Sequence, residues 1–495
     1  MTLSLYNTLT RRQEPFEALE PGKVRIYCCG VTVYDYCHLG HARSYIVWDV
    51  MRRYLTWRGY RVKYVQNFTD IDDKILNRAR KEGSSMEEVA DRYTQAYFED
   101  MARLNVLEAD SYPRATHTLD GIKRLIHELE NKGYAYAAGG DVYYSVRQFA
   151  EYGRLSGRKL EEMQAGASGR LEKDPEEPKK KDPFDFALWK SAKPGEPSWD
   201  SPWGAGRPGW HIECSAMVRD NFGETIDIHT GGADLVFPHH ENEIAQSEAA
   251  TGKSLAKYWL HNGMVKVNGE KMSKSLGNFT TIRDLLDRPV EPMVLRLFVL
   301  QAHYRKPLDF TEDAIVSATN SWKTLKEALL FGGQYGDRLG WSQREARSES
   351  NSEGQSEAQS QSHLERFQEA MDDDLNFPLA LAVVFELAKD IQRDRNLLVH
   401  EGKTETNPEV LQQQWQTLLS LARVLGLEVE AEAETSPSQE ADGLSDAEIE
   451  ALILARKEAR KAKNYAESDR IRDELKAKGI TLIDAPGGVT RWHKE

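Results

Sequence analysis

The chain has 495 residues, a formal net charge of −14, 40% hydrophobic residues and 29% charged residues. This length exceeds what one hydrophobic core supports, so we expect about two to four domains of ordinary globular composition. The sequence shows no apolar run long enough to span a membrane, no secretory signal and only four cysteines, which excludes a membrane protein and a disulfide framework and favours the cytoplasm.

The first predicted unit combines two strands and a helix. Residues 24–29 and 61–68 have the apolar character of buried strands, and 40–57 carries apolar residues at helical spacing. A strand, a helix and a strand in this order indicate a parallel, doubly wound sheet. Residues 38–41 then follow the carboxyl end of the first strand, where such sheets bind ligands and where a helix N-terminus attracts phosphate.

Later segments extend this α/β pattern. We expect helix over 85–135, a strand and a tight turn over 227–234, and a helix over 238–250. From about residue 284 the pattern is mostly helical, and residues 479–492 indicate a hairpin with Pro-Gly-Gly at its turn.

Charge and composition divide the C-terminal part. Residues 342–363 contain no Val, Ile, Leu, Phe or Tyr, which predicts an exposed, disordered loop. Residues 428–450 hold nine carboxylates and no Lys or Arg, whereas 456–478 hold nine Lys and Arg against five Asp and Glu. The global acidity therefore does not exclude a local nucleic-acid-binding face.

These patterns predict a Rossmann-like α/β catalytic domain with an insertion, then an all-α domain and a small α+β module. The predicted boundaries are 1–120 and 206–320 for the two catalytic halves, 121–205 for the insertion, 321–427 for the helical domain, 428–443 for an acidic linker and 444–495 for the C-terminal module.

Two short motifs could surround a triphosphate. His38 and His41 are three residues apart at a helix start, and Gly40 between them allows a nucleotide to approach the backbone. Lys271 and Lys274 lie in a loop of small residues that could close over departing pyrophosphate. Displacement at an α-phosphate needs such charge stabilisation and alignment. Either motif alone is more simply a solvated histidine pair or a basic turn.

A second set of side chains could bind a metal. Cys29 ends the first strand, Cys214 lies further along the chain, and His239 and Glu243 share one face of a helix at i and i+4. Two thiolates, an imidazole and a carboxylate suit zinc. The spacing leaves other assignments open, because buried thiols and a solvated helix pair fit as well. The rivals for the same positions are Cys28, Cys37 and His240.

The motif pair, in this order and at this separation, resembles the signature of class I aminoacyl-tRNA synthetases. The chain is similar to the cysteinyl-tRNA synthetase family from about residue 3 to 320, and more weakly through the C-terminal hairpin. The segments that carry this resemblance are 27–35, 38–41, 67–74, 206–217, 237–243 and 271–278.

The resemblance implies the site residues and ligands. It implies that Cys29, Cys214, His239 and Glu243 hold one Zn²⁺ that selects cysteine over serine by its thiolate, so that no editing domain is needed. It implies catalytic roles for His38, His41, Lys271 and Lys274 on ATP, which Mg²⁺ accompanies. The further implied contacts are Gly40, Gly231, Gly232, Asp234 and Lys274 to ATP, and Thr69 and Trp210 to cysteine.

The expected reaction is cysteine–tRNA ligation in two steps, by a cytoplasmic monomer with tRNA-Cys, ATP and L-cysteine as partners and no membrane association. The C-terminal helices, Tyr465 and Trp492 are expected to contact tRNA through phosphates and stacking. The alternatives are a cysteine:amino-sugar ligase of the same superfamily, which residues 364–495 argue against, and a non-catalytic tRNA-binding paralogue, which the intact histidines and lysines argue against.

Overall fold

The structure is a computed structural model of the whole chain. It describes residues 2–162, 179–272, 276–341, 355–429, 446–485 and 489–494. The described chain divides into two compact units. The first comprises 1–323, 362–384 and 420–427, and the second comprises 324–361, 385–419 and 428–495.

The first unit is organised by a parallel sheet of strand order β10-β9-β3-β4. Its strands are β3 (Lys23–Thr32), β4 (Arg61–Thr69), β9 (Ile226–Gly232) and β10 (Ala256–Asn262). Their long buried runs follow from packing on both faces, as the sequence of a parallel sheet requires. The predicted βαβ unit and the α/β class are confirmed.

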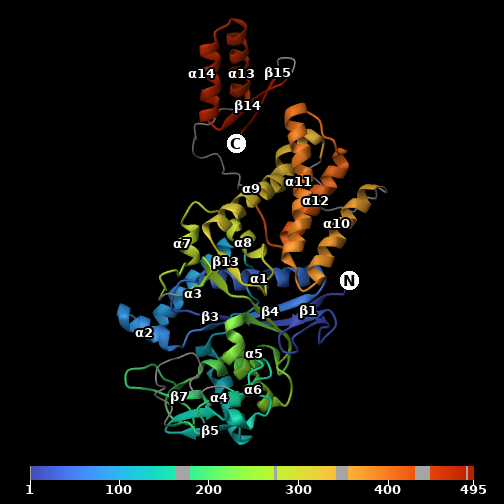
Figure 1. Cartoon of the computed structure of the whole chain (residues 1–495). Helices are drawn as coiled ribbons and strands as arrows, with labels where there is room; N and C mark the ends of the chain where they lie inside the picture. The colour runs from blue at the N-terminus through green and yellow to red at the C-terminus, as the bar shows by residue number, and fades with distance from the viewer. Residues whose placement is uncertain are drawn as a thin grey trace. The chain divides into compact units, whose positions relative to one another are not determined.

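Helices cover both faces of this sheet. α1 (Leu39–Trp57) connects β3 to β4 on one face, while α5 (Trp210–Phe222) and α6 (Glu241–Thr251) belong to the other (Figure 1). The side chains of Cys28 and Cys29 lie on opposite faces of the sheet, because neighbouring strand residues point in opposite directions. Cys28 interacts with Tyr64, whereas the Cys29 sulfur faces Cys214 on α5.

The prediction of continuous helix over 85–135 is wrong in its middle. α2 (Asp73–Glu82) and α3 (Met86–Arg103) form a helical hairpin, and α4 (Leu119–Asn131) begins only after an irregular stretch. That stretch runs along β4, where Val65 and Phe68 form bridges with Ser111 and Arg114. Pairing with the sheet edge thus replaces helix there.

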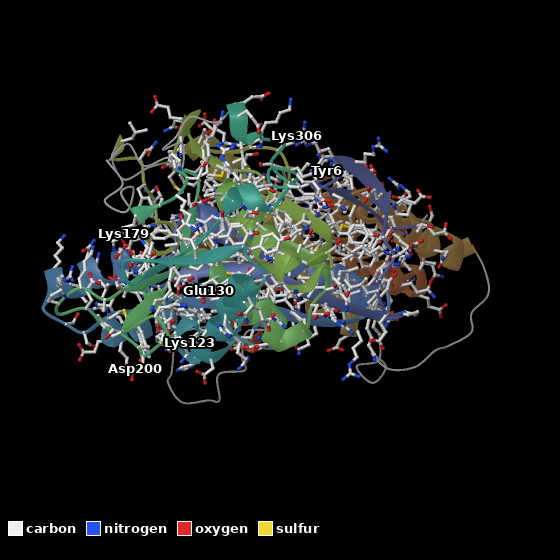
Figure 2. The ribbon with its side chains drawn as sticks, turned by 90° about the horizontal axis from the view of Figure 1, so that it is seen from below. Tyr6, Lys123, Glu130, Lys179, Asp200 and Lys306 are labelled. Atoms are coloured by element: carbon white, nitrogen blue, oxygen red, sulfur yellow. The ribbon has the colours of Figure 1, made fainter. Side chains whose placement is uncertain are left out.

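The insertion is built on an antiparallel sheet of order β5-β6-β7-β8. Its strands are β5 (Ala135–Ala138), β6 (Asp141–Tyr144), β7 (Phe186–Ser191) and β8 (Gly206–Pro208). Figure 2 views this side, with Lys123, Glu130 and Asp200 labelled. Glu130 Oε2 accepts from Trp203 Nε1 at 2.8 Å, which joins α4 to the loop before β8.

The first unit has two further small sheets and two short helices. A short sheet of order β12-β11-β13 flanks the lysine motif, and the N-terminal hairpin pairs β1 with β2. The elements are β1 (Ser4–Asn7), β2 (Arg12–Pro15), β11 (Val265–Val267), β12 (Glu270–Lys271), β13 (Leu308–Phe310), α7 (Ile282–Leu286) and α8 (Pro292–Leu300).

Four longer helices follow the catalytic half: α9 (Glu312–Tyr335), α10 (Gln355–Asp372), α11 (Phe377–Glu401) and α12 (Pro408–Val424). The loop predicted over 342–363 is wrong for 355–363, because α10 begins at Gln355; its other residues lie outside the described chain. Gln, Glu and Ala have high helix propensity, so a segment without apolar residues can still be helical. The amphipathic residues that follow belong to the same helix and stabilise it by packing. Residues 362–384 and 420–427 of the predicted helical domain cluster with the first unit.

The C-terminal module has a small core of its own. α13 (Asp446–Lys461) packs on α14 (Tyr465–Ala477), and β14 (Ile480–Ala485) pairs antiparallel with β15 (Val489–Lys494). Ile449, Ile453, Ile471, Leu475 and Ile480 form the core. The predicted hairpin is confirmed, whereas its turn and most of the acidic linker lie outside the described residues. Among the described helices, none is long and apolar enough to cross a membrane.

Candidate functional site

The histidine motif caps α1. His38 is the N-cap residue, and its Nδ1 accepts from the backbone N–H of Gly40 at 3.0 Å and of His41 at 3.4 Å. His41 Nδ1 in turn accepts from the backbone N–H of His38 at 3.2 Å, and the two rings stack with centroids 3.7 Å apart. A neutral imidazole whose Nδ1 accepts carries its proton on Nε2. The capping geometry therefore gives each ring an Nε2–H donor.

Electrostatics disfavour a charge on His41. Burial lowers the pKa of His41 well below its ordinary value, and the neighbouring His38 and Lys74 lower it further. Gly40 leaves no room for a side chain, since a Cβ there would lie 2.8 Å from the His38 ring. The site thus offers neutral hydrogen-bond donors at a helix N-terminus, which favours an anion.

The segment after the lysine motif is hydrogen-bonded to the histidine motif. Leu39 N donates to Thr280 O at 3.2 Å, and Ile282 N donates to Cys37 O at 2.8 Å. The Phe279 ring meets the edge of His38 at 5.3 Å between centroids. Lys271 is exposed in β12, and Lys274 lies outside the described residues. The structure therefore brings the lysine segment beside the histidines without describing the second lysine.

The segment before the lysine motif is held by Arg43, a residue that the sequence interpretation missed. Arg43 is fully buried in α1 and donates to the carbonyls of Met264 at 2.9 Å and Tyr304 at 3.0 Å, and also to Lys306 O. Burial lowers the pKa of Arg43 only to about 10, so the guanidinium stays charged. Helix α1 is consequently fastened to both flanks of the lysine motif.

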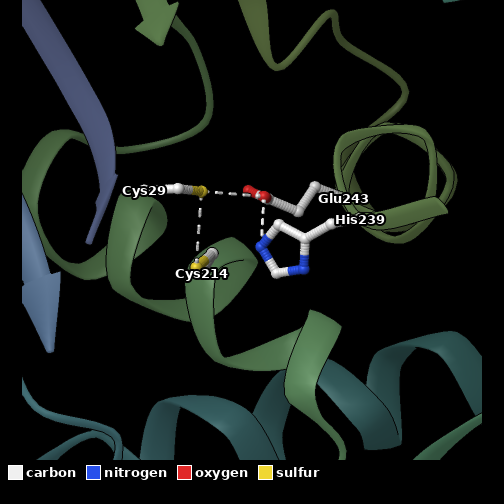
Figure 3. A group of neighbouring side chains, drawn as sticks. All are labelled: Cys29, Cys214, His239 and Glu243. Carbon is white, nitrogen blue, oxygen red and sulfur yellow. Dashed lines mark hydrogen bonds and ion pairs between the residues drawn. The ribbon is translucent and has the colours of Figure 1, made fainter. Parts of the chain in front are cut away.

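The four predicted metal ligands converge in the structure. One ligand atom from each of Cys29, Cys214, His239 and Glu243 lies within 4.8 Å of the others, and all four residues are buried (Figure 3). Cys29 Sγ is 3.8 Å from Cys214 Sγ and 3.4 Å from Glu243 Oε1. His239 Nε2 is 3.0 Å from the same carboxylate oxygen. This buried Cys/His/Glu cluster fits a metal site.

The charges in the cluster suit a cation. Hydrogen bonding by Cys29, together with His239, lowers the pKa of Cys214 to about 6 against the opposing effect of burial. Burial alone would raise the pKa of Glu243, but His229 and His239 lower it to about 2. Burial raises the pKa of Cys29 well above its ordinary value. The Cys214 thiolate, the Glu243 carboxylate and a second thiol, Cys29, that a cation would deprotonate are thus gathered away from water.

A second set of ligand atoms shares two members with the first. Cys29 and Glu243 also lie within 4.8 Å of atoms from His229 and His240. The two sets differ in their outer partners. His239 Nδ1 lies 2.9 Å from His211 Nδ1, whereas the buried His229 Nδ1 has no hydrogen-bond partner in the described chain. Metal-binding histidines nearly always use their other ring nitrogen in a hydrogen bond, which favours the first set.

Of the three rivals for the metal positions, two lie away from the cluster and one is adjacent to it. Cys28 points to the α1 face of the sheet, and Cys37 is buried beside Asp100 and Arg283. His240 is adjacent to the cluster, with Nε2 3.3 Å from Cys29 Sγ, and its Nδ1 is 2.8 Å from His261 Nε2. No periodicity in the sequence signals these buried histidine contacts, because His229 and His261 lie on separate strands.

Two predicted cysteine-binding residues border the cluster. The Trp210 ring stacks on His239 with centroids 4.2 Å apart and keeps 40% of its surface exposed. Thr69 is buried at the end of β4, where its Oγ1 donates to Glu213 Oε2 at 3.2 Å. Burial raises the pKa of Glu213 well above its ordinary value, and Cys214, Asp70 and Asp72 raise it further. Glu213 lies within segment 206–217, for which the family resemblance implies no role of this residue.

Two of the three predicted adenosine contacts, Gly231 and Gly232, end β9, and Asp234 lies in the turn that follows. A Cβ on Gly231 would lie 2.7 Å from the His240 ring, and one on Gly232 would lie 2.5 Å from Asp234 Oδ1. Asp234 is exposed. The close approach of neighbouring side chains therefore accounts for both glycines and leaves the carboxylate accessible.

Family models match three consecutive parts of the chain. Residues 15–320 match the tRNA synthetases class I (C) catalytic domain, 366–430 a DALR domain and 442–490 a cysteinyl-tRNA ligase anticodon binding domain. Solved structures with the same fold include a Mycobacterium tuberculosis methionyl-tRNA synthetase in complex with methionyl-adenylate. It is 17% identical with a TM-score of 0.55, over 81% of this chain and 89% of that one. The catalytic half thus defines a class I aminoacyl-tRNA synthetase.

Full-length relatives identify the family within the class I aminoacyl-tRNA synthetases. A cysteine–tRNA ligase of Gloeothece citriformis is 69% identical over 495 residues, and those of Rippkaea orientalis and Trichodesmium erythraeum are each 68% identical. Each match covers 100% of both chains. The chain belongs to the cysteine–tRNA ligase family.

Proposed function

We propose that this protein activates L-cysteine with ATP and transfers it to the 3′ end of tRNA-Cys. The observation that carries the proposal is that one strand, β3, contributes Cys29 to a buried Cys/His/Glu cluster and leads directly to a histidine pair at the N-terminus of α1. The cluster suits a thiol-bearing substrate, and the histidine pair suits a phosphate.

In the activation step, the cysteine carboxylate attacks the α-phosphorus of ATP and pyrophosphate leaves. The Nε2–H groups of His38 and His41 donate to oxygens on which negative charge develops, while Lys271 and Lys274 hold the departing pyrophosphate. The backbone at Gly40 approaches the phosphates, Gly231 and Gly232 receive the adenosine, and Asp234 accepts from ribose hydroxyls. Mg²⁺ accompanies ATP. The adenylate is then attacked by a hydroxyl of the terminal tRNA adenosine.

Cys29, Cys214, His239 and Glu243 would hold Zn²⁺. The donor set supports this choice, because two thiolates, an imidazole and a carboxylate match zinc, and His239 has its outer partner in His211. When bound, Zn²⁺ supplies a soft Lewis acid that prefers a thiolate to a neutral hydroxyl, which separates cysteine from serine. Thr69 and Trp210 border the position that the amino acid would take.

The proposed tRNA contacts, oligomeric state and cellular location are inferred from the family and from the charge pattern. The helices after residue 320 and the module 444–495 would contact the tRNA. The module would do so through the basic residues of 456–478 and through stacking by Tyr465 and Trp492. The protein would work as a cytoplasmic monomer. These parts rest on the match to an anticodon binding domain and on the segregated charge.

Cysteine-dependent pyrophosphate exchange, followed by charging of total tRNA and metal analysis, tests the proposal. We expect exchange with cysteine and very little with serine, charging of one tRNA species, and about one zinc per chain. Exchange that transfers cysteine to an amino-sugar but not to tRNA would support the rival ligase. Tight tRNA binding without exchange would support a non-catalytic paralogue.

A further inference from the structure

An incompletely paired carboxyl group lies beside the metal cluster. Glu213 is fully buried on α5, directly before Cys214. Its Oε2 accepts from Thr69 Oγ1 at 3.2 Å, while its Oε1 has no hydrogen-bond partner within the described chain. A carboxyl group buried in this way is costly unless something else completes its interactions.

Three other buried carboxylates near the sheet, Glu243, Asp49 and Glu241, are better paired. Glu243 lies 2.9 Å from His229 Nε2 and 3.0 Å from His239 Nε2, and Asp49 pairs with Arg53 and Arg296. Glu241 accepts from the backbone N–H groups of Leu155 and Ser156 with its two oxygens. For Glu213, by contrast, no ion pair with a basic residue occurs among the described residues. The missing partner is therefore best sought in a ligand.

The position of Glu213 relates it to the substrate. Asn67 and Thr69 are two residues apart on β4 and so share one face of the strand. Asn67 Oδ1 lies 3.8 Å from Cys214 Sγ, and Thr69 Oγ1 contacts Glu213. Along β4, the residue that contacts Glu213 is therefore nearer the carboxyl end of the strand than the residue beside Cys214. Doubly wound folds bind their ligands at this end of the sheet.

Neighbouring acidic groups are already engaged. Asp70 Oδ2 accepts from Thr116 Oγ1 at 2.5 Å and its Oδ1 from Thr116 N at 3.1 Å. Asp72 caps α2 by accepting from Lys74 N at 2.8 Å. Among these three carboxyl groups, Glu213 is the one that is fully buried with an unpaired oxygen.

We infer that Glu213, supported by Thr69, binds the α-ammonium group of the amino-acid substrate and requires a free amino group. The inference rests on the proposed function and deepens it. A cysteine held by its sulfur at the cluster must direct its carboxylate to ATP, and its third polar group, the ammonium, then needs an anionic acceptor. Glu213 supplies the counter-charge, and the ammonium completes the interactions of the buried carboxylate.

The test compares two ligands, with and without an amino group, on the unmodified protein and on a variant. Binding of L-cysteine and of 3-mercaptopropionate, which lacks the amino group, is measured by calorimetry on the zinc-loaded full-length protein and on Glu213→Gln. The substitution should weaken cysteine binding by about tenfold or more, the scale of a hydrogen bond to a charged group, and should leave 3-mercaptopropionate nearly unchanged. Glu241→Gln, which alters a buried carboxylate with backbone partners, should affect both ligands alike.

Equal losses for both ligands in Glu213→Gln would overturn the inference and leave Glu213 a structural residue. Zinc content and the thermal unfolding midpoint are measured for each variant, and Glu213→Asp, which keeps the charge, should restore part of the preference for cysteine if the inference holds. A lack of cysteine-dependent pyrophosphate exchange in the unmodified protein would instead refute the proposed function. The two failures are thus distinguishable.

Discussion

Cys28 and Cys29 are adjacent in the chain but belong to different environments. Cys29 faces Cys214 and Glu243, whereas Cys28 lies on the opposite face of β3 near Tyr64. Cys214→Ser should reduce zinc content and weaken cysteine binding by at least about tenfold, the loss seen when even an outer partner of a metal ligand is removed. Metal analysis and calorimetry measure both effects. Cys28→Ser is the matched control, and a similar loss of zinc in that variant would contradict the assignment.

Gly30 shows how one residue shapes the site by lacking a side chain. The register of β3 against β4 shifts between Cys28 and Val31, and Gly30 N donates to Asn67 Oδ1 at 2.9 Å. A Cβ on Gly30 would lie 1.5 Å from Asn67 O, so the strands would have to separate beside Cys29.

Gly30→Ala should therefore lower the free energy of unfolding by about 1–3 kcal/mol, the usual cost of overpacking. Thermal unfolding checks this. Gly333→Ala is the control, because a Cβ there meets nothing within 4 Å and alanine favours the helix. If Gly30→Ala were as stable as Gly333→Ala, the close approach of the strands would not constrain this position.

At the scale of elements, α1 connects the histidine motif to the flanks of the lysine motif. Its N-terminus is hydrogen-bonded to residues 280–282, and Arg43 one turn later holds the carbonyls of Met264, Tyr304 and Lys306. A lysine has one nitrogen and lacks the planar fork that reaches several carbonyls at once. Arg43→Lys should loosen the attachment of the lysine segment to α1.

We expect Arg43→Lys to slow adenylate formation by about tenfold or more, because small misplacements of positioning groups cost up to about a hundredfold in rate. Zinc content and cysteine affinity should stay unchanged. Pyrophosphate exchange measures the rate, and calorimetry measures the affinity. A variant that lost cysteine affinity in proportion to its rate would indicate general disruption of the fold instead.

Local patterns predicted the elements that carry the site, and long-range contacts set the rest. Hydrophobic periodicity predicted β3, α1 and β4 because each is regular over many residues. The histidine motif predicted His38 and His41, whereas the four cluster residues followed from the family resemblance, because their spacing left other assignments open. Periodicity failed at 104–118, where the chain pairs with a sheet edge, and at 355–363, where polar residues continue a helix. Contacts such as His240 with His261 depend on how strands are ordered in the sheet, which spacing does not encode.

At the scale of the whole molecule, the C-terminal module has the features of a separable part. It has its own apolar core of Ile449, Ile453, Ile471, Leu475 and Ile480, and it matches an anticodon binding domain over 442–490. The segment 428–450, which includes the start of α13, is strongly acidic, whereas 456–478 carries an excess of basic residues. The residues proposed for adenylate formation all lie within the match to the catalytic domain at 15–320. Chemistry and tRNA binding should therefore be separable by truncation.

A chain ending near Thr435 should keep cysteine-dependent pyrophosphate exchange at close to the full rate, since it retains the cluster and both nucleotide motifs. It should charge tRNA poorly, and the tRNA binding that remains should fall less steeply with salt, because each lost phosphate contact lowers the slope of log affinity against log salt by about one. Exchange kinetics, charging assays and binding over a range of salt concentrations measure the three effects. The full-length chain is the control, and zinc analysis verifies that the truncated catalytic part is intact. Charging at full efficiency by the shortened chain would remove the tRNA-binding role from the C-terminal module.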